Sequence, residues 1–266
     1  MPMAQLGALT LHYQVQGKGE PLLLIMGYRG SSFMWGEEFL ALLARHFRVI
    51  IFDNRGTGLS DKPDTAYTIG MMADDAAALL TALGLPRACV FGVSMGGMIA
   101  QELALRYSRR VKRLILGCTS CGGPQAVTAA PEVLSQFLAP PGVPREEALC
   151  RQWSVIFSPS FITQHPQFLE RLTRQALAYP TPFHTAVRQM RAMQRFNTYG
   201  RLGQILLPTL ILTGDQDVLV PPGNSLLLTQ KIPGATRCHI AGAGHGFFWE
   251  APDRVTALLQ AFCGRL

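Results

Sequence analysis

The chain has 266 residues, of which 48% are hydrophobic and 15% charged, and its formal net charge is +7. That length fits one large domain, or one domain with an insertion, and the apolar content excludes an intrinsically disordered chain. No apolar run approaches the roughly 20 residues of a membrane span, and the basic residues are spread along the chain, which disfavours both a membrane protein and a nucleic-acid-binding protein.

The first 118 residues alternate between buried strands and helices. After a hairpin-like pattern about Gly7, continuous apolar runs predict buried strands, and apolar residues at helical spacing between them predict helices. This alternation predicts a mostly parallel sheet with helices on both faces. The expected strands cover 21–27, 48–56 (including a polar loop at its end), 88–93 and 111–118, and the expected helices 39–47, 68–85 and 95–107.

The alternation stops between residues 122 and 205. This segment contains prolines, aromatic residues and helical patterns, for example at 144–157, but no convincing strand. Strand and helix patterns then resume with strands at 208–217 and 236–244 and a closing helix. We therefore predict an α/β fold whose core comprises residues 1–121 and 206–266, with residues 122–205 as a helical cap. We call residues 122–205 the inserted segment.

Chemically versatile side chains gather where the predicted strands end. Ser94 follows one strand, Asp215 and Asp217 follow another, and His245 follows the last. Because the carboxyl ends of parallel strands share one edge of a sheet, these side chains are expected to meet there. A hydroxyl, a carboxylate and an imidazole in that order suit nucleophilic catalysis, in which the imidazole takes the proton of the serine and the carboxylate orients the imidazole.

The stretch Gly92-Val93-Ser94-Met95-Gly96 matches the nucleophile-elbow pattern, a sharp strand-to-helix turn that exposes a strained serine. Glycines on either side are expected where strand and helix approach closely. The backbone N–H of Met95 would then donate to a developing oxyanion, and we expect a second donor, the N–H of Tyr28, from the loop after the first buried strand.

Five landmarks in order, "LLLIMGYRGSS", "FDNRGTGLSD", "GVSMGG", "GDQDVLVP" and "GAGHGFFWE", resemble the α/β-hydrolase superfamily over nearly the whole chain. The resemblance is greatest to small serine esterases and to enol-lactonase-like and methylesterase-like members. It implies the α/β-hydrolase fold, with Ser94 as nucleophile, Asp217 as triad acid and His245 as base. Haloalkane dehalogenases and epoxide hydrolases of this fold carry aspartate at the elbow, so Ser94 argues against those activities.

We therefore expect a carboxylesterase that acts on small to medium apolar esters through an acyl-enzyme. A lactonase, a carbon–carbon bond hydrolase or a perhydrolase would use the same triad, and a non-catalytic ligand receptor is a further alternative. The candidate pocket residues are Met26, Trp153, Phe157, Phe183, Met190 and Phe247. Those of the inserted segment more often form its core at such helical spacing, and Phe247 could equally pack the final loop.

Other expectations concern partners and location. The N-terminal residues lack a basic stretch followed by an apolar run, and the six cysteines read as reduced thiols, which favours a cytoplasmic protein. The CxxC at 118–121 has no second ligand pair for zinc and is interpreted as small residues at a strand end. No metal or organic cofactor is expected, and the partner is a small-molecule ester, with no nucleic acid and no membrane; a homo-oligomer is possible.

Overall fold

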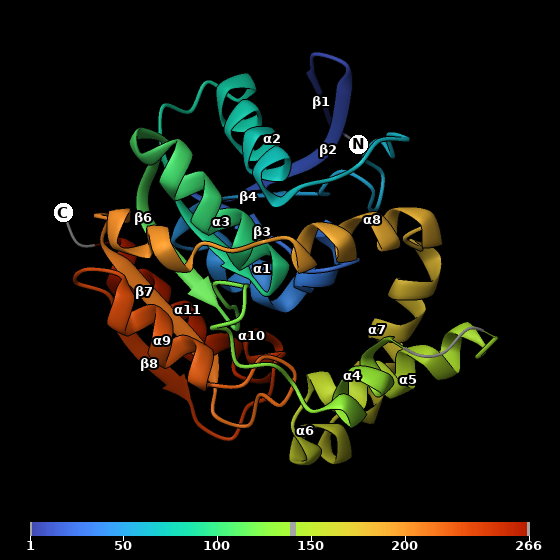
Figure 1. The fold of residues 1–266 in the computed structure, drawn as a ribbon. Coiled ribbons are helices and arrows are strands. Elements are labelled where there is room, and N and C mark those ends of the chain that lie inside the picture. The colour runs from blue at the N-terminus through green and yellow to red at the C-terminus, as the bar shows by residue number, and fades with distance from the viewer. Residues whose placement is uncertain (1, 139–141, 265–266) are drawn as a thin grey trace.

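An eight-stranded sheet lies at the centre of the fold (Figure 1). The computed structural model describes residues 2–138 and 142–264. The strand order is β1-β2-β4-β3-β5-β6-β7-β8; β1 pairs antiparallel with β2 and β2 with β4, and the remaining neighbours are parallel. The strands are β1 (Met3–Leu6), β2 (Leu9–Gln16), β3 (Glu20–Ile25), β4 (Phe47–Phe52), β5 (Ala88–Val93), β6 (Val111–Gly117), β7 (Thr209–Gly214) and β8 (Thr236–Ile240).

The buried stretches of the central strands are continuous apolar runs because both faces of the sheet are covered. In β3, Leu22 and Leu24 belong to one hydrophobic cluster, whereas Leu23 and Ile25 belong to another. Successive side chains of a strand point to opposite faces, so two separate cores require an unbroken apolar run rather than an alternating one. The mostly parallel, doubly covered sheet expected from the sequence is therefore confirmed.

Six helices of the core form these two covering layers. The first cluster includes residues of α2 (Ile69–Ala82), α3 (Met95–Arg106) and α9 (Gly223–Lys231). The second includes residues of α1 (Glu37–Ala44), α10 (Phe247–Glu250) and α11 (Pro252–Cys263). Among the described residues, no helix combines the length and apolar character needed to cross a bilayer.

The inserted segment leaves the sheet after β6 and returns before β7, and its helices lie beyond the ends of the strands (Figure 1). Its own hydrophobic cluster includes Trp153 and Phe157. The division of the chain into core and cap at 121/122 and 205/206 stays a prediction. The helices of this segment are α4 (Pro131–Leu138), α5 (Arg145–Ile156), α6 (Pro159–Gln164), α7 (Pro166–Ala178) and α8 (Phe183–Gln194).

The polar loop after β4 braces the loops around it. The carboxylate of Asp53 accepts hydrogen bonds from the backbone N–H groups of Ser32 (2.5 Å) and Leu59 (2.8 Å). The guanidinium of Arg55 donates two 2.6 Å hydrogen bonds to Asp75 on α2, and both side chains are nearly buried, 11% and 10% exposed. These contacts fasten the loop after β3 and helix α2 to the sheet.

Replacement of Arg55 by alanine should lower the free energy of unfolding by about 3–5 kcal/mol, because it leaves the Asp75 carboxylate buried without its partner. The matched control is Arg106→Ala, which removes an ion pair to Asp74 whose side chains are 45% and 40% exposed and should cost under about 1 kcal/mol. Urea denaturation of the two variants measures the difference. Equal losses would show that the Arg55 pair stabilises the fold no more than a surface pair.

Candidate active site

Ser94 occupies the sharp turn between β5 and α3 in a strained backbone conformation, φ 56° and ψ −123°. A positive φ is rare for a residue with a side chain and costs free energy that the surrounding structure must supply. A Cβ atom at Gly92 would collide with the carbonyl of Gly96, and one at Gly96 would collide with the carbonyl of Ile25. The two glycines therefore permit the close approach that the elbow pattern predicted.

His245 lies in the loop after β8, and Asp217 lies in the loop after β7. Their side chains meet: Nδ1 of His245 is 2.8 Å from Oδ2 of Asp217. The other carboxylate oxygen, Oδ1, accepts hydrogen bonds from the N–H groups of Leu219 (2.9 Å) and Val220 (2.8 Å). Asp215 instead accepts a hydrogen bond from the N–H of Gly242. Of the two acids left open at this strand end, the structure brings Asp217 to the histidine.

The Asp217 carboxylate raises the pKa of the His245 imidazole. Burial disfavours the charged ring, but the adjacent Asp217 carboxylate and the Cys118 sulfur outweigh that effect, and the pKa of His245 is raised well above its ordinary value. An opposite charge within hydrogen-bond distance stabilises the imidazolium. The carboxylate thus stabilises the charged state that a histidine passes through when it accepts a proton from a nucleophile.

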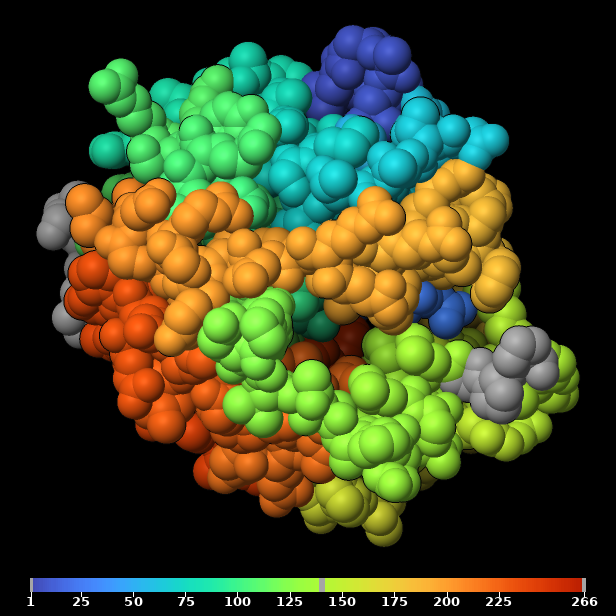
Figure 2. Space-filling model, in the orientation of Figure 1, coloured from blue at the N-terminus to red at the C-terminus, as the bar shows by residue number. Residues whose placement is uncertain are grey.

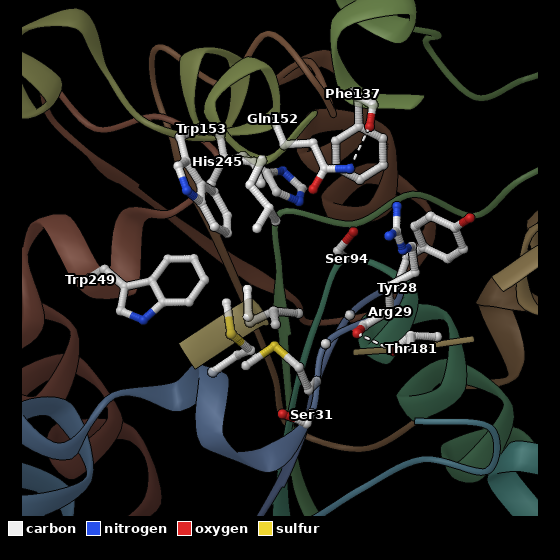
Figure 3. Close-up of a pocket in the computed structure, with 18 of the residues that line it drawn as sticks. Tyr28, Arg29, Ser31, Ser94, Phe137, Gln152, Trp153, Thr181, His245 and Trp249 are labelled. Atoms are coloured by element: carbon white, nitrogen blue, oxygen red, sulfur yellow. Dashed lines mark hydrogen bonds between the residues drawn. The ribbon is translucent and has the colours of Figure 1, made fainter. Parts of the chain in front are cut away.

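Ser94 and His245 line the same pocket (Figure 3). Ser94 is held from both sides of its backbone: its N–H donates to the carbonyl of Gly117 (2.9 Å), and its carbonyl accepts from the hydroxyl of Thr119 (2.7 Å). No hydrogen bond joins the Ser94 hydroxyl to the imidazole within the described ranges, 2–138 and 142–264. Such contacts often tighten only when substrate binds.

Two backbone N–H groups near the serine are available as donors. Met95 is the first residue of α3, so its N–H has no partner within the helix. The loop after β3 lies against the elbow, since a Cβ atom at Gly27 would be 3.6 Å from the Ser94 hydroxyl oxygen. Tyr28 follows directly, and its N–H makes no hydrogen bond to another described residue. This arrangement suits the oxyanion hole predicted from Tyr28 and Met95.

The pocket is mainly apolar and opens between the inserted segment and the core; Figure 2 shows a hollow there, with C-terminal residues in red at its base. Met26 and Trp153 line it, as predicted. Other lining side chains, several of them from the inserted segment, are Met34, Phe137, Leu149, Ile156, Phe248 and Trp249.

The other four predicted pocket residues are not among those that line this pocket, and a role for them in substrate binding stays a prediction. Phe183 is 81% exposed at the start of α8. Met190 also lies on α8, whose buried face, which includes Gln189, packs against the loop after β4. Phe157 is buried inside the inserted segment. Phe247 is fully buried in the core beneath the site. Phe157 and Phe247 therefore fill protein cores, whereas Phe183 lies on the surface.

Cys118 was interpreted from the sequence as a small residue at a strand end, but it lines the pocket beside His245. Its sulfur, a carboxylate oxygen of Asp217 and a ring nitrogen of His245 lie within 4.8 Å of one another. These are ligand types that Zn²⁺ accepts, yet the imidazole and carboxylate are already joined by a hydrogen bond, and burial raises the pKa of the thiol. Its position at the carboxyl end of β6 was the signal available in the sequence.

The pocket is also lined by polar residues that were not predicted, among them Arg29, Arg145 and Gln152. Gln152 donates from Nε2 to the carbonyl of Phe137 (2.8 Å; Figure 3). Arg29 directly follows Tyr28 and could have been found from that position. Arg145 lies at the first turn of α5, where no sequence pattern distinguishes it from a solvated surface residue.

Comparison with known proteins agrees with the fold that the structure shows. Residues 20–252 match a family model described as the alpha/beta hydrolase fold. The chain is 33% identical over 267 residues to a protein named as a carbamate hydrolase, RutD, from Azorhizobium caulinodans, covering 100% of this chain and 99% of the relative.

Two solved structures illustrate the range of similar proteins. One is Est816, described as an N-acyl homoserine lactone degrading enzyme, with a TM-score of 0.81, 28% identity and coverage of 98% of this chain and 100% of the other. The other is a thermophilic esterase from Thermogutta terrifontis, with a TM-score of 0.83, 27% identity and coverage of 99% and 97%.

Proposed function

The chain belongs to the α/β-hydrolase fold family, and we propose that within it this hydrolase cleaves carboxylic esters through an acyl-enzyme on Ser94. The observation that carries the proposal is the constellation at one pocket: a strained serine at the elbow and a histidine hydrogen-bonded to a buried aspartate. These three groups have the roles that acyl transfer needs.

In the proposed mechanism, the Ser94 hydroxyl attacks the ester carbonyl while Nε2 of His245 takes its proton. The carbonyl oxygen becomes an oxyanion, which the N–H groups of Tyr28 and Met95 stabilise; one such donor contributes about 2.7–4 kcal/mol in measured cases. His245 then returns the proton to the departing alcohol. Water, deprotonated by His245, releases the acid from Ser94 and restores the free enzyme.

The acyl portion is expected to be small to medium and apolar, because the lining side chains near Ser94 are mainly methionine, aliphatic and aromatic groups. The names of the similar proteins point to three bonds, in a carbamate, a lactone and an ester. All three place a carbonyl carbon next to an oxygen or nitrogen leaving group, so the same triad can attack each of them.

A substrate panel tests the proposal. Ethyl esters of two to ten carbons, simple lactones and an N-alkyl carbamate are compared by kcat/KM, and esters are expected to exceed the other classes by at least about tenfold, a difference of roughly 1.4 kcal/mol in transition-state binding. A short β-diketone tests for carbon–carbon bond cleavage, and acetate with hydrogen peroxide tests for perhydrolysis. Turnover of another class well above the esters would reassign the reaction while keeping the triad, and slow single turnover with a lasting adduct would indicate a receptor.

A further inference from the structure

The pocket that contains Ser94 is positively charged. Arg29 and Arg145 both line it, and none of its lining residues in the described part of the chain is aspartate or glutamate. The triad acts on the ester carbonyl alone and gives no role to two cations in a mainly apolar pocket. The charge therefore calls for its own explanation.

Neither of these two arginines forms an ion pair with a carboxylate of a described residue. Nη2 of Arg145 donates to the backbone carbonyl of Ala176 (2.9 Å), and the Arg29 guanidinium has no hydrogen bond or ion pair to any described residue. Glu147, only two residues from Arg145, pairs with Arg151 instead. Elsewhere in the described chain arginines do pair with acids; they are Arg55, Arg106, Arg151, Arg188 and Arg201.

The two cations are also close enough to affect one another. Partial burial and, after it, the positive charge of Arg29 lower the pKa of Arg145. Arg29 is partly buried and Arg145 is exposed, so solvent screens part of the repulsion between the two like charges. A bound anion would relieve this repulsion and give the Arg29 guanidinium a hydrogen-bond acceptor.

The backbone of Arg29 is fixed in a manner that suits a binding residue. Its φ is 61°, a conformation that is costly for a residue with a side chain. Contacts with the inserted segment hold it there: the Arg29 N–H donates to Oε1 of Gln189 (3.0 Å), and its carbonyl accepts from the hydroxyl of Thr181 (2.8 Å). Figure 3 shows the Thr181 contact and the side chain of Arg29 beside Tyr28, the proposed oxyanion donor.

We propose that Arg29, assisted by Arg145 at the pocket wall, forms a subsite for a carboxylate carried by the substrate, so that the enzyme prefers esters bearing a second, free carboxylate. This inference rests on the proposed ester hydrolysis. Arginine suits a carboxylate because its planar guanidinium can donate two parallel hydrogen bonds to the two oxygens. The apolar lining would then contact the chain between the ester and the carboxylate.

Matched ester pairs test the subsite by turnover. Monoethyl adipate is compared with ethyl hexanoate, and 3-acetoxypropanoate with propyl acetate, by ethanol or acetate release. For at least one pair the anionic ester should have a kcat/KM higher by about tenfold or more, mainly through KM, and the preference should shrink in high salt. Arg29→Met should remove it, Arg29→Lys should restore part of it, and Arg145→Met should weaken it less.

Binding to the inactive Ser94→Ala protein separates the two proposals. Isothermal titration of this variant with monoethyl adipate and with ethyl hexanoate measures the subsite without turnover. If the anionic ester binds more tightly and Arg29→Met abolishes this preference, the subsite is supported even if the wild-type protein hydrolyses no ester. The absence of hydrolysis would overturn only the proposed function. Equal binding and equal turnover of the charged and neutral members of both pairs would overturn the subsite alone.

Arg237 supplies the control for charge and folding. It lies exposed on β8 and does not line the pocket. Arg237→Met removes the same charge from the protein, so it should leave the preference for anionic esters unchanged. Thermal melting of all variants verifies that they fold, and a preference that fell equally in Arg237→Met would assign the effect to net charge rather than to a subsite.

Discussion

Replacement of Ser94 by alanine is expected to lower kcat for ester hydrolysis by about 10⁴- to 10⁶-fold, since removing the nucleophile of a catalytic triad leaves only the oxyanion hole and substrate binding to accelerate the reaction. The fold should tolerate the change. Ser94 has no side-chain hydrogen bond to another described residue, and alanine keeps its Cβ atom. Stopped-flow release of a chromogenic alcohol measures both the acylation burst and the steady rate, and both should disappear.

Ser135→Ala is the control for this experiment. Ser135 is an exposed serine of α4 whose hydroxyl donates to the carbonyl of Glu132, so its loss should change the rate less than about twofold. A fluorophosphonate should add to wild-type protein and to Ser135→Ala, but not to Ser94→Ala. Retained hydrolysis or retained labelling in Ser94→Ala would place the nucleophile at another residue.

The central strands could be predicted from the sequence because apolar side chains cover them on both faces. The strands that became β3, β5 and β7 are buried on both faces, which requires continuous apolar runs that few other structures produce. The short helices α6 and α10 were not identified individually. Helices of one or two turns carry too few residues to show a periodic pattern.

The proposed catalytic residues and the pocket differ in how far the sequence determines them. Ser94, Asp217 and His245 each follow a recognisable strand, so the geometry of a parallel sheet brings them to one edge. Pocket residues depend on how the inserted helices sit over that edge, which local patterns do not encode. Phe157 illustrates the difference: the same aromatic side chain serves a core or a cavity, and here it packs against Phe161.

Replacement of Asp217 by asparagine is expected to lower kcat by about 10⁴-fold with little loss of structure, by analogy with the same change in a serine protease. The amide oxygen can still accept the hydrogen bonds from Leu219 and Val220. Its NH₂ group then faces Nδ1 of His245 and donates to it, which places the ring proton on Nε2, where the base must be free. Asp215→Asn, in the same loop, is the matched control and should retain most activity, because the Asp215 carboxylate accepts a hydrogen bond from the N–H of Gly242, which the amide oxygen of asparagine can also accept.

The pH dependence distinguishes this role from a purely structural one. In the wild type, kcat/KM should rise with pH as the free enzyme loses the proton from His245, and the midpoint should lie above the ordinary histidine pKa because Asp217 stabilises the imidazolium. Asparagine carries no charge, so in Asp217→Asn the pKa of His245 should fall and the midpoint of the pH profile should move to lower pH. The value of kcat/KM on the high-pH plateau should be much smaller than in the wild type. A merely distorted site would lose rate without moving the midpoint. An unshifted midpoint in Asp217→Asn, or an equal shift in Asp215→Asn, would contradict the assignment of Asp217 as the residue that orients His245 and stabilises its protonated form.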